Sequence, residues 1–481
     1  MVRLKMHQSR QVGVSLRGLE ARRGRGVSLA SLSSFRAGHP GNVSQPADGL
    51  LSVGGMLAIS SIVLAWVSIG FKWLNTSVVS AGQKSDLFSL TLDEPRSARL
   101  MRLLAFALFI GAGVFGALLR RRARLPRMVS IPLVILIGAS VWWTLFGYEP
   151  SQYVDALLGT WNPMGFTMCF GVFAGLDRSL WRWLRPVALW LAYGSVALGW
   201  YYAVRFSSIE SFAGANPMVE YLQLAFWLTW CALVLTQTAG WRAFVPALIP
   251  MALCLPLAIM ISSRSFTALA SVGFAVGIFF AMRGSLRRAR FRLIAVILCT
   301  GVVVVGFLCA LSLAAPTRLE AFQNRMLEDS RTSQYSEFFR QIPVSSLIPG
   351  RGPKASYTYG EFANYEYIDN QFLFIAFKLG LAVLLGYCAV VLWPGLSQLF
   401  RGGNRPQQMI GVLFVFWTFA SLGLSIFHGI LPNPQNFLII LLAGRSIDLA
   451  AAPRPASPVF HRSLSRLDAL VTVRRFPGAL R

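Results

Sequence analysis

Apolar runs about as long as a membrane-spanning helix recur along most of this chain. A helix needs about twenty mainly apolar residues to cross the roughly 30 Å of hydrocarbon in a bilayer. Runs of this kind predict twelve spans, at residues 51–71, 101–119, 128–147, 160–176, 186–204, 218–237, 242–262, 265–282, 291–313, 371–396, 407–427 and 435–450. The predicted fold is therefore all-α, a polytopic integral membrane protein with about twelve transmembrane helices.

One long polar segment, residues 316–370, interrupts this pattern before the tenth predicted span. It begins with a helix-like run, breaks at Pro343, passes a glycine turn at 349–354 and ends in a tyrosine-rich strip. We expect a disordered basic tail at 1–50, a transmembrane domain at 51–450 with a large loop at 314–370, and a second basic tail at 451–481.

Composition supports a membrane protein. Hydrophobic residues make up 55% of the chain and charged residues 13%, and the mean hydropathy is +0.56. These values exclude an ordinary soluble domain. The net charge of +26 does not indicate nucleic-acid binding, because the basic residues lie in short segments between apolar runs rather than on a soluble basic face.

The distribution of charge predicts the topology. With the N-terminus inside, the cytoplasmic segments are 1–50, 120–127, 177–185, 237–242, 283–292, 397–406 and 444–481. They hold 31 of the 45 Lys and Arg residues and 5 of the 19 acidic residues, so the whole charge excess lies on one side. Cytoplasmic loops are enriched in Lys and Arg. We therefore expect both termini inside and the 314–370 loop outside.

Neither a metal site nor a cofactor is predicted. The six cysteines all lie in predicted spans, which favours packing roles over disulfides. No Cys/His cluster, phosphate-binding Walker loop or nucleophile elbow is present. Among the histidines, only His428 is expected to reach the outer side.

A second polar feature divides residues 242–282. These forty-one mainly apolar residues would form a helix of about 60 Å, twice the thickness of the hydrocarbon. A turn is therefore expected near Ser262-Ser263-Arg264-Ser265, on the outer side. Arg264 there either extends to lipid headgroups or pairs with an anion between two helix ends.

The outer loop contains several cations. Arg331 and Arg340 are nine residues apart and lie on opposite sides of a continuous helix. Arg340 follows Glu337 by three residues, the spacing of a surface ion pair. Arg331 is either solvated or binds a ligand. Gly350-Arg351-Gly352, followed by Lys354, is either a simple turn or a backbone nest for phosphate oxygens.

Asp369 and Asn370 stand where the tenth span begins. Asp369 either caps that helix or is a carboxylate that acts as a general base. Lys378 lies nine residues further on, about 13 Å deeper along a helix. It either extends outward to the membrane surface or binds a phosphate.

These features resemble the O-antigen polymerase and ligase superfamily. The resemblance covers roughly residues 240–450. It consists of Ser263-Arg264 at an outer helix turn, the stretch from Arg331 through Pro343 to Gly350-Arg351-Gly352, and Asp369-Asn370 with Gly380 ten residues after Asn370.

The resemblance implies a metal-independent glycosyltransferase of the GT-C type in the bacterial inner membrane, without a cofactor. Its substrate would be an oligosaccharide linked to undecaprenyl diphosphate. Arg264 and Arg331 match the positions that hold the diphosphate, and Asp369 matches the catalytic position. Membrane lipid and the flippase and chain-length regulator of the same pathway are implied partners, and nucleic acid is not. Further candidates for the site are Arg340, Gly350, Arg351, Gly352, Lys354, Asn370, Lys378 and His428.

One departure from the family separates two activities. Ligases of the superfamily typically have histidine where this chain has Asp369. That difference favours a polymerase of O-antigen or exopolysaccharide repeat units over a ligase, although His428 could supply an imidazole. The alternative outside the enzymes is a flippase or other transporter of lipid-linked oligosaccharide. A transporter is expected to place charges at membrane depth, and apart from Lys378 the predicted spans lack them.

Overall fold

The computed structural model describes most of the chain between residues 51 and 451. The described residues are 51–74, 95–119, 125–153, 166–205, 217–236, 241–261, 263–282, 289–314, 316, 320, 323, 330–360, 362–366, 368–400, 405–423 and 434–451. The predicted tail at 1–50, all but the first residue of the predicted tail at 451–481, and His428 lie outside them.

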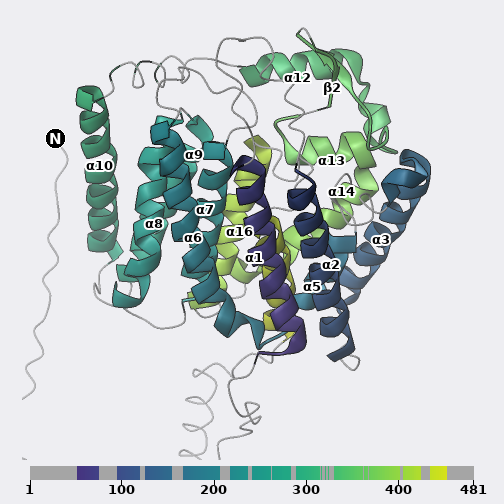
Figure 1. Cartoon of the computed structure of the whole chain (residues 1–481), viewed down its shortest axis with the longest axis horizontal. Helices are drawn as coiled ribbons and strands as arrows, with labels where there is room; N and C mark the ends of the chain where they lie inside the picture. Colours follow the sequence, from purple (N-terminus) through teal and green to yellow (C-terminus); the bar gives the residue numbers. More distant parts are fainter. Residues whose placement is uncertain are drawn as a thin grey trace, which may run out of the picture. The chain divides into compact units, whose positions relative to one another are not determined.

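Long helices dominate the described residues (Figure 1). The helices before residue 315 are α1 (Val53–Leu74), α2 (Arg96–Leu119), α3 (Arg127–Gly147), the shorter α5 (Phe166–Ala174), α6 (Leu180–Arg205), α7 (Pro217–Val234), α8 (Trp241–Met260), α9 (Arg264–Ala281) and α10 (Ala289–Ala314). Near the C-terminus, α16 (Arg405–Gly423) and α17 (Pro434–Ala451) follow. Each of the predicted spans overlaps a helix.

Six helices in the described part of the chain are long and apolar enough to cross a membrane. They are Val53–Trp73, Arg96–Leu118, Arg127–Gly147, Leu180–Arg205, Arg242–Met260 and Leu381–Phe400. Shorter apolar helices lie at Met218–Val234, Ser265–Ala281 and Val296–Cys309. The all-α class is confirmed, whereas twelve spans and the side on which the loop lies remain predictions.

The span predicted at 371–396 is not one continuous helix, and its membrane-length part starts later than predicted. The chain forms α13 (Gln371–Leu379), breaks at Gly380, and continues as α14 (Leu381–Tyr387), a π-helical turn at Cys388–Leu392 and α15 (Trp393–Phe400). Gly380 has φ 96°, a conformation that favours glycine and ends a helix. The membrane-length helix therefore begins at Leu381, and α13 belongs with the polar segment before it.

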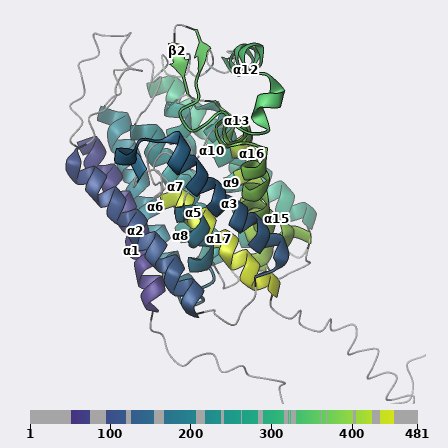
Figure 2. The ribbon, with the colours of Figure 1, turned by 90° about the vertical axis from the view of Figure 1, so that its right-hand side faces the viewer.

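The described residues between 330 and 380 form a small substructure with its own hydrophobic cluster, which we call the cap. It contains α12 (Ser330–Gln341), the 3₁₀ turn η4 (Val344–Leu347), the antiparallel strands β1 (Tyr357–Tyr359) and β2 (Phe362–Tyr365), and α13. Its own core consists of Phe338, Ile342, Tyr357, Ile368 and Phe377. The cap lies at one end of the helices, and the C-terminal end of α17 lies toward the other (Figures 1 and 2).

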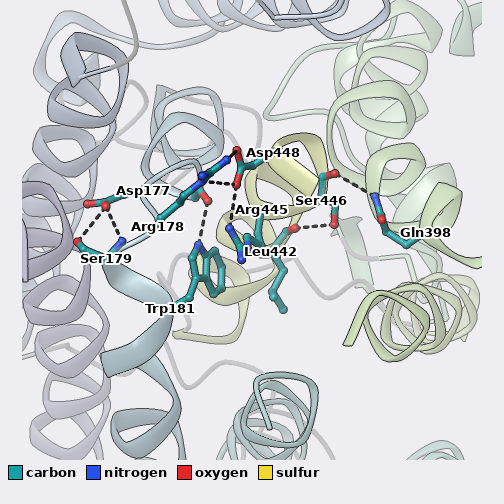
Figure 3. A network of polar contacts seen from close by, with 10 residues as sticks. Asp177, Arg178, Ser179, Trp181, Gln398, Leu442, Arg445, Ser446 and Asp448 are labelled. Atoms are coloured by element: carbon teal, nitrogen blue, oxygen red, sulfur yellow. Dashed lines mark hydrogen bonds and ion pairs between the residues drawn. The ribbon is translucent and has the colours of Figure 1, made fainter. Parts of the chain in front are cut away.

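A polar network ties the helices together at that other end (Figure 3). The Asp448 carboxylate, only 4% exposed, accepts hydrogen bonds from Arg178 at 3.2 and 3.3 Å and from Arg445 at 2.8 Å. The Gln398 amide donates to the Ser446 carbonyl at 2.9 Å. Because a buried carboxylate without a partner is destabilising, these contacts fix the turn before α6 and the end of α15 against α17.

Candidate functional site

Arg331 joins three parts of the chain that are distant in sequence. From α12, its Nη2 donates a hydrogen bond to Ser265 Oγ at 2.9 Å, and its Nε lies 3.7 Å from Asp369 Oδ2. A Cβ added at Gly423, the last residue of α16, would lie 3.4 Å from Arg331 Nη1. The guanidinium is thus at the start of α9, the end of α16 and the carboxylate of Asp369.

Two further side chains of α12 hold the backbone of Asp369. Gln334 Oε1 accepts from the Asp369 N–H at 3.1 Å, and the Tyr335 hydroxyl donates to the Asp369 carbonyl at 3.2 Å. Residues three and four apart share one face of a helix. A single face of α12 therefore contacts the N–H, the carbonyl and the carboxylate of Asp369.

The N-cap of α13 is Asn370, so the interpretation of Asp369 as the cap is wrong. Asn370 Oδ1 accepts from the N–H groups of Phe372 and Leu373, both at 3.0 Å. These bonds satisfy amides that a helix start leaves without intrahelical partners. The Asp369 carboxylate forms its ion pair with Arg331 instead, and it is 29% exposed.

The charge of this carboxylate acts on three tyrosine hydroxyls of the cap. Burial, with a smaller contribution from the Asp369 charge, raises the pKa of Tyr335 above its ordinary value. Burial and then Asp369 raise the pKa of Tyr365 to about 12, and burial also raises the pKa of Tyr357. All three hydroxyls are therefore protonated at neutral pH and can donate hydrogen bonds.

The Gly350-Arg351-Gly352 turn is attached to the end of α13. The N–H of Arg351 donates to the Phe377 carbonyl at 2.8 Å, and the N–H of Gly352 to the Lys378 carbonyl at 2.9 Å. Because these amides already satisfy the end of a helix, they do not form the phosphate nest considered from the sequence. The side chains of Arg351 and Lys354 are exposed.

Two glycines allow this attachment. A Cβ at Gly350 (φ 80°) would lie 2.5 Å from the N of Gly380, and a Cβ at Gly380 would lie 2.6 Å from the Pro349 carbonyl oxygen. Trp143 of α3 adds a hydrogen bond from Nε1 to the Leu379 carbonyl at 3.2 Å. The break at Gly380 is thus the point at which the cap joins the long helices.

Lys378 has an environment that differs from both predicted ones. Its side chain is 3% exposed, and Nζ donates to the Ala355 carbonyl at 2.6 Å and to Glu366 Oε2 at 3.1 Å. Burial lowers the pKa of Lys378, and the neighbouring Glu366 partly opposes that shift. The ammonium holds the segment after β2 against α13 and does not extend to the surface.

Arg340 forms the predicted surface pair with Glu337, at 2.6 Å and with the arginine 72% exposed. It does not share the partners of Arg331, because α12 continues unbroken between the two. The predicted turn near 262–265 is also confirmed, since α8 ends at Met260 and α9 begins at Arg264. Arg264 is the residue immediately before Ser265, which accepts a hydrogen bond from Arg331.

Sequence reasoning missed Ser265, Gln334 and Tyr335. Gln334 and Tyr335 could have been found from the sequence, because they follow Arg331 by three and four residues and so share its helical face. Ser265 could not be found in this way, since its contact joins residues 66 positions apart.

The fold and this site define a helical protein with helices of membrane-crossing length and a polar cap that places a guanidinium beside a carboxylate. Among the described residues, no group of three or more His, Cys, Asp or Glu residues is arranged to hold a metal ion. No protein-family model matches the chain, and no curated protein matches it significantly.

The chemistry open to the site follows from its two charged groups. A guanidinium presents forked N–H donors that suit phosphate oxygens, and a partly exposed carboxylate can accept a proton. Both groups are within reach of solvent, with Arg331 36% and Asp369 29% exposed. The site can therefore bind an anion and remove a proton in the same place.

Proposed function

We propose that this protein is a polysaccharide polymerase of the bacterial inner membrane. It joins oligosaccharide repeat units carried on undecaprenyl diphosphate into O-antigen or exopolysaccharide, with its cap on the periplasmic side. The observation that carries the proposal is the position of Arg331, between Ser265 at the start of α9 and the carboxylate of Asp369. These contacts support the proposal because Arg331 and Asp369 belong to two of the sequence features that resemble the superfamily, and Ser265 directly follows the third.

In the proposed reaction, Arg331 and Arg264 bind the diphosphate of the lipid carrier. A hydroxyl of the incoming repeat unit attacks the anomeric carbon of the growing glycan, and the bond from that carbon to the diphosphate oxygen breaks. Asp369 accepts the hydroxyl proton, and the lipid diphosphate leaves with the electron pair. Stabilisation of this leaving group by fixed guanidinium donors is the main electrostatic contribution.

The ion pair between Arg331 and Asp369 fits this sequence of events. Its Nε–Oδ2 distance of 3.7 Å is longer than that of a close charge-assisted hydrogen bond, about 2.7–2.9 Å. A diphosphate can therefore take over the guanidinium and leave the carboxylate for the hydroxyl. Gln334 and Tyr335 hold the Asp369 backbone in place during that exchange.

The test is the glycan profile of cells that lack this protein. A polymerase defect leaves single repeat units on the lipid carrier and on the final acceptor. Long polymer that stays on the lipid would identify a ligase instead, and repeat units confined to the inner leaflet would identify a flippase. Wild-type chain length and attachment in the deletion strain would exclude all three functions. Complementation with Arg331→Ala, beside Arg340→Ala as the control, links the phenotype to the site.

A further inference from the structure

The cap has two highly exposed aliphatic residues on one short turn. Val344 is 67% exposed and Ile348 is 63% exposed, and they lie at the start of η4 and directly after it. Single exposed apolar residues are common on protein surfaces. What sets these two apart is their position relative to the membrane-length helices.

Ile348 lies directly against the beginning of a candidate membrane span. Its carbonyl accepts a hydrogen bond from the N–H of Leu381 at 3.0 Å, and Leu381 is the first residue of the Leu381–Phe400 span. Leu381 and Leu385 are 40% and 60% exposed. Exposed apolar positions thus continue from the span onto the cap.

A second candidate span ends at the same level. Gly147, the last residue of α3, is so close to the cap that an added Cβ would lie 2.8 Å from Pro353 Cδ. The end of α3 meets the cap beside α13 and α14 (Figure 1). Trp142 and Phe146 near this end are 56% and 68% exposed, as expected of aromatic side chains at a membrane interface. Residues 348–353 therefore lie level with the ends of two candidate spans.

Exposed cations follow the aliphatic pair. Arg351 and Lys354 are both exposed, three and six residues after Ile348. Segments that lie in the membrane interface combine apolar residues, buried about 5–10 Å into the headgroup and acyl boundary, with Lys or Arg at the level of the phosphates. This turn has the same combination.

We propose that the turn formed by Val344, Ile348 and Arg351, which we call the interfacial edge, binds the bilayer. The two aliphatic side chains lie at the boundary between headgroups and acyl chains, and Arg351 contacts lipid phosphate. The partner is the phospholipid of the membrane that holds the spans, rather than another protein. The inference does not depend on the proposed enzymatic function, since it concerns a surface of the cap away from Arg331 and Asp369.

The test measures depth with spin labels in the full-length protein, reconstituted in phosphatidylcholine vesicles after replacement of the native cysteines. Single cysteines at Val344 and Ile348 are labelled with a nitroxide, with Leu385 as the reference inside the membrane and Thr358, exposed on β1, as the reference in water. The measured quantity is the ratio of a label's collision rate with oxygen to its collision rate with a water-soluble nickel complex. This ratio should be several-fold higher for the Val344 and Ile348 labels than for the Thr358 label.

Two outcomes would overturn the proposal. Labels at Val344 and Ile348 as accessible to nickel as the Thr358 label would place the edge in water. Labels shielded from both reagents would mean that protein covers the edge. The phosphate contact has its own test, because Arg351→Gln should make the Ile348 label shallower, whereas Arg340→Gln should not. Equal depth in the two variants would remove Arg351 from the edge.

Discussion

At the residue scale, Asp369 and Asn370 are neighbours with similar side chains and different roles. Either can cap a helix, and the structure gives that role to Asn370, whose Oδ1 accepts two amide hydrogen bonds. Contacts from α12 determine this choice, since Gln334 and Tyr335 fix the backbone of Asp369. The carboxylate is thereby directed to Arg331.

The substitution Asp369→Asn separates chemistry from folding. Asparagine has nearly the same shape but cannot accept the proton, so we expect a loss of polymer synthesis by about 10²–10⁴-fold if base catalysis is lost. The amount of protein in the membrane should stay normal, because the cap of α13 is the next residue. The measurements are polymer length on gels and protein level by immunoblot. Near-normal polymer would remove Asp369 as the base and direct attention to His428.

Arg331→Lys tests whether the site needs the planar, paired N–H donors of a guanidinium or only a positive charge. Lysine keeps the positive charge but cannot offer paired planar donors to a phosphate, nor reach both Ser265 and Asp369 in the same way. We expect polymer synthesis to remain close to that of Arg331→Ala. Arg340→Ala is the matched control, since an exposed ion pair contributes only about 0–1 kcal/mol. If Arg340→Ala abolished polymer synthesis while Arg331→Ala left it unchanged, the assignment of phosphate binding to Arg331 would be wrong.

Lys378 gives the cap a dependence on pH. Burial makes its folded pKa lower than the unfolded value, so the unfolded chain binds more protons in the interval between them and stability rises with pH there. The pKa values of Tyr357 and Tyr365 are raised in the folded state. Above the ordinary tyrosine pKa of about 10 the folded chain therefore binds more protons than the unfolded chain, and stability falls as the pH rises. The melting temperature in detergent should therefore rise as the pH approaches that value from below and then fall. Lys378→Met should abolish the rise and leave the fall, and a rise that persists in this variant would contradict the assignment.

At the element scale, the central feature is the break at Gly380. The helix α13 stops where the turn around Gly350 reaches it, and the amides of that turn bond to the carbonyls at its end. The connection needs two backbones in direct contact, which only residues without a Cβ permit here. The position of the cap on the long helices thus depends on two glycines thirty residues apart.

Gly380→Ala should detach the cap from the spans. Its cost combines backbone strain, about 1–3 kcal/mol, with a collision against the Pro349 carbonyl. Gly360→Ala is the matched control, because Gly360 also has a positive φ of 57° but nothing within 4 Å of an added Cβ. Limited proteolysis of the cap should be accelerated much more by Gly380→Ala than by Gly360→Ala. Equal rates would mean that strain alone, not the contact, determines the effect.

The sequence predicted the turn before Arg264 but not the break at Gly380, for a physical reason. Residues 242–282 are too long for one span, so length alone requires a turn there. Around Gly380 both flanking segments are apolar, and the break depends on contact with Pro349 and Gly350. Contacts of that kind cannot be read from hydropathy. The same limit applies to Lys378, whose pairing with Glu366 is set by the fold of the cap.

At the scale of the whole molecule, the charge distribution makes a prediction about sidedness. The arginine-rich segments between spans belong inside, and the cap belongs outside. A single cysteine at Ser356 in the cap should react with a thiol reagent that does not cross the membrane. A single cysteine at Ser285, in an arginine-rich segment, should react only after the membrane is permeabilised. The native cysteines must be replaced first, since Cys299 and Cys309 are exposed. Equal labelling in intact cells would refute the predicted topology.

The length of α13 carries a consequence for insertions and deletions. Its first turn is fixed by Asn370 and its last by Gly380, with nine helical residues between them. A helix advances one residue by about 100°, since 3.6 residues make a turn. One residue added or removed within α13 would therefore rotate Asp369 away from Arg331 or pull Gly380 off Pro349, even if every side chain discussed above stayed the same. Variants of this protein should tolerate changes of sequence within α13 more readily than changes in its number of residues.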